Sequence, residues 1–179
     1  RVGRQPGRNP PGSQGDDMAK KKKGMAKTLP MRALEEKGIA YEPLQQSRKQ
    51  YTAEGVASDL GVPVAQVVKA MIVQHSDRSF ALMVVPGDQQ LSLKKASTAL
   101  QDKRLSLAQE RDVQRVTGYQ VGAVSVLGFR RDDVPSYLDQ RVLELDRAII
   151  SAGRPDLGLA LSPADLARAL GDAKLGDYC

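Results

Sequence analysis

The strongest constraint on the fold is a pair of short apolar runs joined by a polar turn. Residues 67–73 and 80–85 are rich in β-branched and other apolar side chains, and residues 75–78 between them are polar. Such runs predict two buried antiparallel strands. Glycines and prolines interrupt the other apolar segments, so we expect a core built from short strands and short helices.

The remaining segments alternate between the two kinds of element. Helices are predicted over residues 29–37, 53–60, 92–100, 109–116 and 162–170, and further strands over residues 39–44, 104–107, 136–138, 147–151 and 157–161. A turn at residues 63–66 and a glycine-rich loop at residues 118–128 complete the pattern. There is no internal repeat and no regular βαβ spacing, which predicts an α+β domain.

Most of the positive charge lies at one end of the chain. Residues 1–24 hold seven Lys and Arg against two Asp, which accounts for +5 of the formal net charge of +6. This segment is poor in apolar residues, so we expect a disordered basic tail ahead of a domain at residues 25–179. A solubilising or adventitious tail is favoured over an RNA-binding arm. The domain itself is nearly neutral and needs a local patch to bind nucleic acid.

Composition excludes several kinds of site. Aromatic residues make up only 4% of the chain, which argues against an RNA binder that stacks bases on an aromatic sheet. With one cysteine, Cys179, and one histidine, His75, neither a disulfide framework nor a zinc site of paired ligands is expected. We expect no metal and no cofactor. No apolar run is long enough to span a bilayer and no signal peptide is apparent, so a cytoplasmic location is predicted.

Two features suggest a site that binds an anionic or acyl ligand. Lys69 is the only charged residue in the apolar run 67–73. It either lies on the exposed face of an edge strand or faces a cleft that receives an anion. Strand alternation places it on one face with Met71, and Ala70 on the opposite face. The glycines of residues 118–128 allow close backbone approach to a ligand, with amide N–H groups free to bind an oxyanion.

Four segments together carry a family resemblance. In order, they read VVKAMIV at 67–73, LSLKKASTAL at 91–100, TGYQVGAVSVLG at 117–128 and SAGR at 151–154. With these segments, the chain resembles the YbaK family of aminoacyl-tRNA deacylases, which is related to the editing domain inserted in bacterial prolyl-tRNA synthetase. The resemblance spans about residues 28–175.

The resemblance implies a fold, an activity and a set of site residues. The implied fold is a single compact domain with a curved, mostly antiparallel mixed sheet flanked by short helices. The implied activity is hydrolysis of the ester that joins a wrong amino acid, typically cysteine or alanine, to the 3′ end of tRNA for proline. Prolyl-tRNA synthetase is a possible partner. The implied catalytic residues are Lys69 and Gly122, and the implied substrate-binding residues are Tyr119, Ala123, Ser125, Val126, Ser151 and Gly153.

The chain also departs from the family pattern. Val126 replaces a loop proline, and Gly158 stands where the YbaK branch has an aspartate, with Asp156 two residues earlier as a substitute. A tyrosine of that branch is missing near Gln46, although Tyr51 follows shortly after it. These departures favour a second hypothesis, a binding module that kept the fold and lost activity. A third hypothesis, a soluble α+β domain in which Lys69 is only the charge of an edge strand, holds only if the four matching segments are coincidental.

Overall fold

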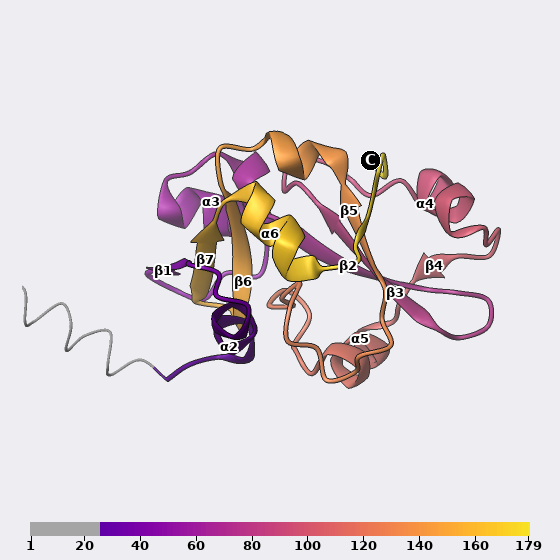
Figure 1. Ribbon diagram of the computed structural model, residues 1–179, viewed down its shortest axis with the longest axis horizontal. Helices are drawn as coiled ribbons and strands as arrows, with labels where there is room; N and C mark the ends of the chain where they lie inside the picture. The colour runs from indigo at the N-terminus through magenta and orange to yellow at the C-terminus, as the bar shows by residue number, and fades with distance from the viewer. Residues whose placement is uncertain (1–25) are drawn as a thin grey trace, which may run out of the picture.

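Two β-sheets form the framework of the computed structural model, which describes residues 26–179 (Figure 1). The predicted basic tail, residues 1–24, lies outside the described residues. One sheet is antiparallel, in the order β1 (Glu42–Gln45), β7 (Leu157–Leu161) and β6 (Ala148–Arg154). The other is mixed, in the order β4 (Ser106–Leu107), β2 (Lys69–Gln74), β3 (Phe80–Val85), β5 (Ser136–Asp139) and β8 (Lys174–Gly176).

A main-chain bridge joins the two sheets. Val67 forms an isolated parallel bridge with Ile149, and the Val68 N–H donates to the Ile149 carbonyl at 2.9 Å. The α+β class is confirmed, and the curved sheet implied by the resemblance consists of two hydrogen-bonded sheets that meet at this point. The segment just before β2 and the start of β6 are therefore held side by side.

Short helices pack around these sheets. They are α2 (Leu29–Glu36), α3 (Ala53–Leu60), α4 (Leu93–Leu100), α5 (Glu110–Thr117) and α6 (Pro163–Leu170), with 3-10 turns η1 (Val64–Gln66) and η2 (Gln140–Glu144). Their first turns are stabilised as expected, since the side-chain oxygens of Thr52 and Ser162 accept main-chain N–H groups at 3.0 and 3.1 Å. No helix within residues 26–179 has the length and hydrophobicity to cross a membrane.

The β2–β3 hairpin separates two buried clusters. Leu82 and Val84 of β3 pack with residues of α5 and α6 in the larger cluster, whereas Ala81 and Met83 pack with α4 in the smaller one. All six residues of β3 are buried. This strand therefore reads as an uninterrupted apolar run, because a strand covered on both faces has no polar side.

Candidate functional site

A cavity of about 480 Å³ opens where the two sheets meet. Its walls come from the segment before α3, from β2, from the start of α5, from the glycine-rich loop and from β6 and β7. Most of the lining is aliphatic, and four charged residues border it: Lys69, Arg154, Glu54 and Glu110. Within residues 26–179 there is no cluster of three His, Cys, Asp or Glu side chains that would hold a metal ion.

The cavity exists because the outer edge of β2 is only partly paired. β4 pairs with Val73 and Gln74 alone, and the Val68 N–H already bonds to Ile149. Strand alternation directs the N–H and C=O of Ala70 to this same edge, where they have no partner among the described residues. A substrate in the cavity thus meets unpaired main-chain groups as well as side chains.

Lys69 lies at the border of this cavity. Its side chain is half-buried, and its ammonium donates to the main-chain carbonyl of Gln89. The predicted alternation is correct, since Met71 packs in the smaller cluster and Ala70 against the larger one. Lys69 and Gly122 line the same cavity. The interpretation of Lys69 as a solvent-exposed edge charge does not fit this environment.

Gly122 brings the glycine-rich loop close to the opposite segment of chain. Its φ is +86°, and a Cβ atom added there would lie 2.9 Å from the Cβ of Tyr51 and 3.0 Å from the Tyr51 carbonyl oxygen. Tyr51 is itself 52% exposed and lines the cavity. Only glycine allows this backbone conformation together with this approach.

Tyr119 supports the loop from behind and does not line the cavity. Its hydroxyl donates to the Leu127 carbonyl at 2.8 Å and lies 3.1 Å from the Gly128 carbonyl. Its ring packs against Gly153, where an added Cβ would lie 2.6 Å from a ring carbon. Burial raises the pKa of Tyr119 to about 12, so the hydroxyl stays protonated as a donor.

Ser151 connects the wall of the cavity to the loop. Its hydroxyl donates to the Ala123 carbonyl at 3.0 Å and accepts from the Gly153 N–H at 3.0 Å. Ser125 is fully buried and its hydroxyl faces the Leu127 N–H at 3.4 Å, while Val126 packs in the larger cluster. Of the predicted site residues, Lys69, Gly122 and Ser151 therefore line the cavity, and the other five shape the loop and wall around them.

Gln46 is a buried polar residue of the cavity lining that was not among the predicted site residues. Its side chain is 6% exposed, and its Oε1 has no hydrogen-bond partner among the described residues. Gln46 directly follows β1, an edge strand with exposed polar ends, so the local sequence did not mark this amide as buried. The available sequence signal for this position was the tyrosine that the YbaK branch has near Gln46 and that this chain lacks.

Asp156 does not take the place of an aspartate on the wall. Arg154 holds its carboxylate through two hydrogen bonds of 3.0 and 2.8 Å, and Gln45 donates to it at 3.3 Å. The bonds from Arg154 and Gln45 lower the pKa of Asp156. Asp156 lies outside the lining, whereas Gly158, which adds no carboxylate, is part of it.

The chain matches the model of a known protein family. The family model of the aminoacyl-tRNA editing domain matches residues 48–169, which contain the cavity edge of β2, the loop and the wall. The chain belongs to the aminoacyl-tRNA editing family. The predicted family is confirmed, and with it the class of chemistry, hydrolysis of aminoacyl-tRNA esters.

Individual relatives agree with this membership. The candidate Cys-tRNA(Pro)/Cys-tRNA(Cys) deacylase EbsC of Enterococcus faecalis is 30% identical over 145 residues, or 80% of this chain and 88% of the relative. The proline–tRNA ligase of Desulforamulus reducens is 34% identical over 108 residues, which are 60% of this chain and 18% of the ligase. The crystal structure of a candidate trans-editing enzyme for prolyl-tRNA synthetase matches with a TM-score of 0.75 and 26% identity, covering 84% of this chain and 94% of that one.

Proposed function

We propose that this editing-family chain acts in trans on tRNA for proline that carries a wrong amino acid, cysteine or alanine. It hydrolyses the ester bond that joins this amino acid to the tRNA. The observation that carries the proposal is one cavity lined by Lys69, by the Gly122 loop and by unpaired main-chain groups of β2. A cavity of about 480 Å³ is large enough for an aminoacyl group on its ribose. The relatives supply the substrate class, because one is named for Cys-tRNA(Pro) and others are prolyl-tRNA ligases.

The reaction needs orientation and charge stabilisation more than a protein nucleophile. Water adds to the ester carbonyl carbon, the bond to the ribose oxygen breaks, and the water's protons end on the released hydroxyl and in solvent. The N–H groups of Gly122 and Ala70, free of described partners, are suited to bind the developing oxyanion. Lys69 places a cation beside the ribose or terminal phosphate. The hydroxyl of Ser151 already donates a hydrogen bond to the Ala123 carbonyl, so we do not assign it the role of nucleophile.

The proton transfer is assigned to the substrate itself. A neighbouring ribose hydroxyl, or the thiol of a cysteinyl group, lies within reach of the ester in any bound pose. His75 does not line the cavity and contacts Asp102 at 3.3 Å. A substrate-assisted route therefore fits a cavity whose lining has no histidine and no cysteine.

A non-catalytic module that binds the tRNA end is the second candidate. The observation that favours it is Gly158, which leaves this part of the wall without a carboxylate. Binding without release of the amino acid distinguishes this candidate from the enzyme.

The direct test is a hydrolysis panel with tRNA for proline charged separately with cysteine, alanine, serine and proline. We expect release of cysteine or alanine at least about tenfold faster than release of proline, since proline is the correct product. Spontaneous hydrolysis is measured in parallel without protein. If none of the four esters is cleaved above that background while the charged tRNA still binds, the binding module is the correct function.

Replacing Gln46 by Leu is expected to separate activity from stability. A buried amide oxygen without a partner costs about 1–3 kcal/mol, so the variant should be as stable as the parent or more stable. Rotation of the Gln46 side-chain amide by half a turn exchanges its oxygen and nitrogen. In our proposal the oxygen then faces the cavity and accepts a hydrogen bond from the α-ammonium of the substrate. We therefore expect kcat/KM to fall about tenfold while the melting temperature holds or rises.

The matched control for that experiment is Gln45→Leu. Gln45 is the last residue of β1 and directly precedes Gln46, and it is exposed and lies outside the cavity lining. Its substitution should leave turnover within about twofold of the parent. Unchanged turnover in Gln46→Leu would show that the amide does not contact the substrate.

A further inference from the structure

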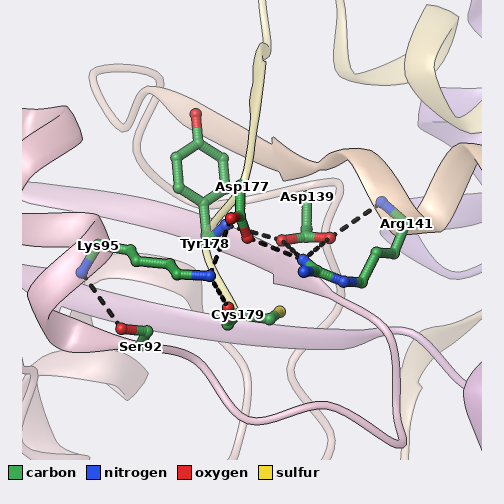
Figure 2. A network of polar contacts seen from close by, with 7 residues as sticks. All are labelled: Ser92, Lys95, Asp139, Arg141, Asp177, Tyr178 and Cys179. Atoms are coloured by element: carbon green, nitrogen blue, oxygen red, sulfur yellow. Dashed lines mark hydrogen bonds and ion pairs between the residues drawn. The ribbon is translucent and has the colours of Figure 1, made fainter.

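The last residues of the chain form a clasp that joins β5 to α4. We define the clasp as residues 177–179, which follow β8 (Figure 2). Asp139 at the end of β5 is fully buried and accepts the Tyr178 N–H at 2.8 Å. Arg141 donates to both Asp139 and Asp177, at 3.2 and 2.9 Å. The clasp is thus anchored to the end of β5 in the mixed sheet.

The other side of the clasp holds the start of α4. The Tyr178 carbonyl accepts the Ser92 N–H at 2.8 Å. The Lys95 ammonium donates to the Asp177 carboxylate at 2.8 Å and also to the main-chain oxygen of Cys179 (Figure 2). The Tyr178 ring is buried edge-on against Tyr137 at 5.9 Å between centroids. Ser92, the residue that caps α4, is therefore fixed by the clasp.

The segment just before Ser92 binds the Lys69 ammonium. We call residues 86–92 the lysine loop, because the Gln89 carbonyl is the acceptor for Lys69. At its start the loop lies directly on the chain before β2, since a Cβ added to Gly87 would lie 2.4 Å from the Val67 carbonyl oxygen. At its end it is held through Ser92 and through the neighbouring Leu91, which packs against the smaller cluster.

We propose that the clasp is a positioning device for Lys69, which it holds at the cavity through the lysine loop. The proposal rests on the proposed function, in which Lys69 contacts the substrate. The Gln89 carbonyl lies between two anchor points, the packed turn at Gly87 and the clasped Ser92. Loosening the second anchor moves this carbonyl, and the ammonium that it binds moves with it. A displacement of about 1 Å in a positioning group lowers rates strongly.

The experiment uses the full chain with Lys95→Met and, as matched control, Lys94→Met. Both lysines are exposed on α4, and the Lys94 ammonium has no hydrogen-bond or ion-pair partner among the described residues, unlike the Lys95 ammonium. Each variant loses one positive charge, but only Lys95→Met removes contacts of the clasp, namely those of the Lys95 ammonium with Asp177 and Cys179. Asp177→Ala removes the same ion pair from the other side, together with the contact between Asp177 and Arg141. An exposed ion pair is worth little, so the expected effects are moderate.

The first measurement is hydrogen–deuterium exchange of the lysine loop. We expect about fivefold faster exchange in peptides covering residues 86–92 for Lys95→Met and Asp177→Ala, and no change for Lys94→Met. The second is the Kd for a proline tRNA minihelix that carries alanine through a nonhydrolysable amide. Binding should weaken about fivefold in Lys95→Met, and this loss should vanish when Lys69 is already methionine.

The outcomes separate the clasp from the function. Equal weakening by Lys95→Met with and without Lys69 would overturn the positioning role, since a general charge or stability effect adds in both backgrounds. Loop exchange that is equal in Lys95→Met and Lys94→Met would also overturn it. If the parent neither binds the minihelix nor cleaves charged tRNA, the proposed function fails, and the loop exchange alone then decides whether the clasp holds the lysine loop.

Discussion

Substituting Lys69 by Ala is expected to lower kcat/KM for deacylation at least about 100-fold while the protein stays folded. Lys69 borders the cavity on the β2 side, and removal of one preorganised donor from an active site costs about 2.7–4 kcal/mol in the transition state. The fold should tolerate the change because the side chain is half-buried and its only described partner is the Gln89 carbonyl at the surface loop.

Single-turnover hydrolysis of the charged tRNA and a thermal melt followed by circular dichroism measure the two effects. Lys69→Met retains the apolar stem of the side chain and should show the same loss, which assigns the effect to the charge. Lys94→Ala is the control for general attraction of tRNA and should change kcat/KM by less than about threefold. Turnover that persists at the parent rate without Lys69 would remove this residue from the mechanism.

Substituting Gly122 by Ala is expected to lower kcat/KM about 100-fold and to destabilise the loop. The position has φ +86°, which costs about 1–3 kcal/mol for a residue with a side chain. The new methyl group would also lie within 3.0 Å of the Tyr51 backbone and side chain, so the loop must move away from the cavity wall. The N–H assigned to the oxyanion moves with the loop.

Gly118→Ala isolates the effect of backbone strain from that of the cavity. Gly118 has a similar φ of +82°, but an added Cβ would meet only the Arg130 side chain at 3.7 Å, and the residue lies outside the cavity lining. We expect both variants to lose stability by similar amounts and only Gly122→Ala to lose most of its activity. A parallel loss of activity in Gly118→Ala would indicate that loop stability, rather than the position of Gly122, controls turnover.

Strong local patterns predicted the elements well. The strand at residues 80–85 agrees with β3 at both ends, because it is apolar throughout and bounded by polar and proline residues. The helices after Thr52 and Ser162 begin where their caps indicate. Two elements were missed, the 3-10 turn after Asp139 and the short β8. Both make long-range contacts, since β8 pairs in parallel with β5 and Arg141 of the 3-10 turn donates to Asp177.

The candidate site was predicted only in part. The lone charge in an apolar run marked Lys69, and glycine spacing marked the loop of Gly122, and both line one cavity. Tyr119 carries the same kind of family signal but faces the loop interior. A pattern of residue types shows that a position is constrained, yet it does not say whether the constraint comes from a ligand or from packing.

By itself, the sequence determined the class of fold, the family and the strand that carries Lys69. Periodicity and helix caps act over a few residues and can therefore be recognised locally. The family is recognised from several motifs that occur together in a fixed order. Only the tertiary structure decided that β2 keeps an open edge, that the Gln46 amide is buried there without a partner, and that the C-terminal residues brace the loop holding Lys69. These features depend on which groups remain unpaired once segments distant in the chain have packed together, and no local pattern encodes that outcome.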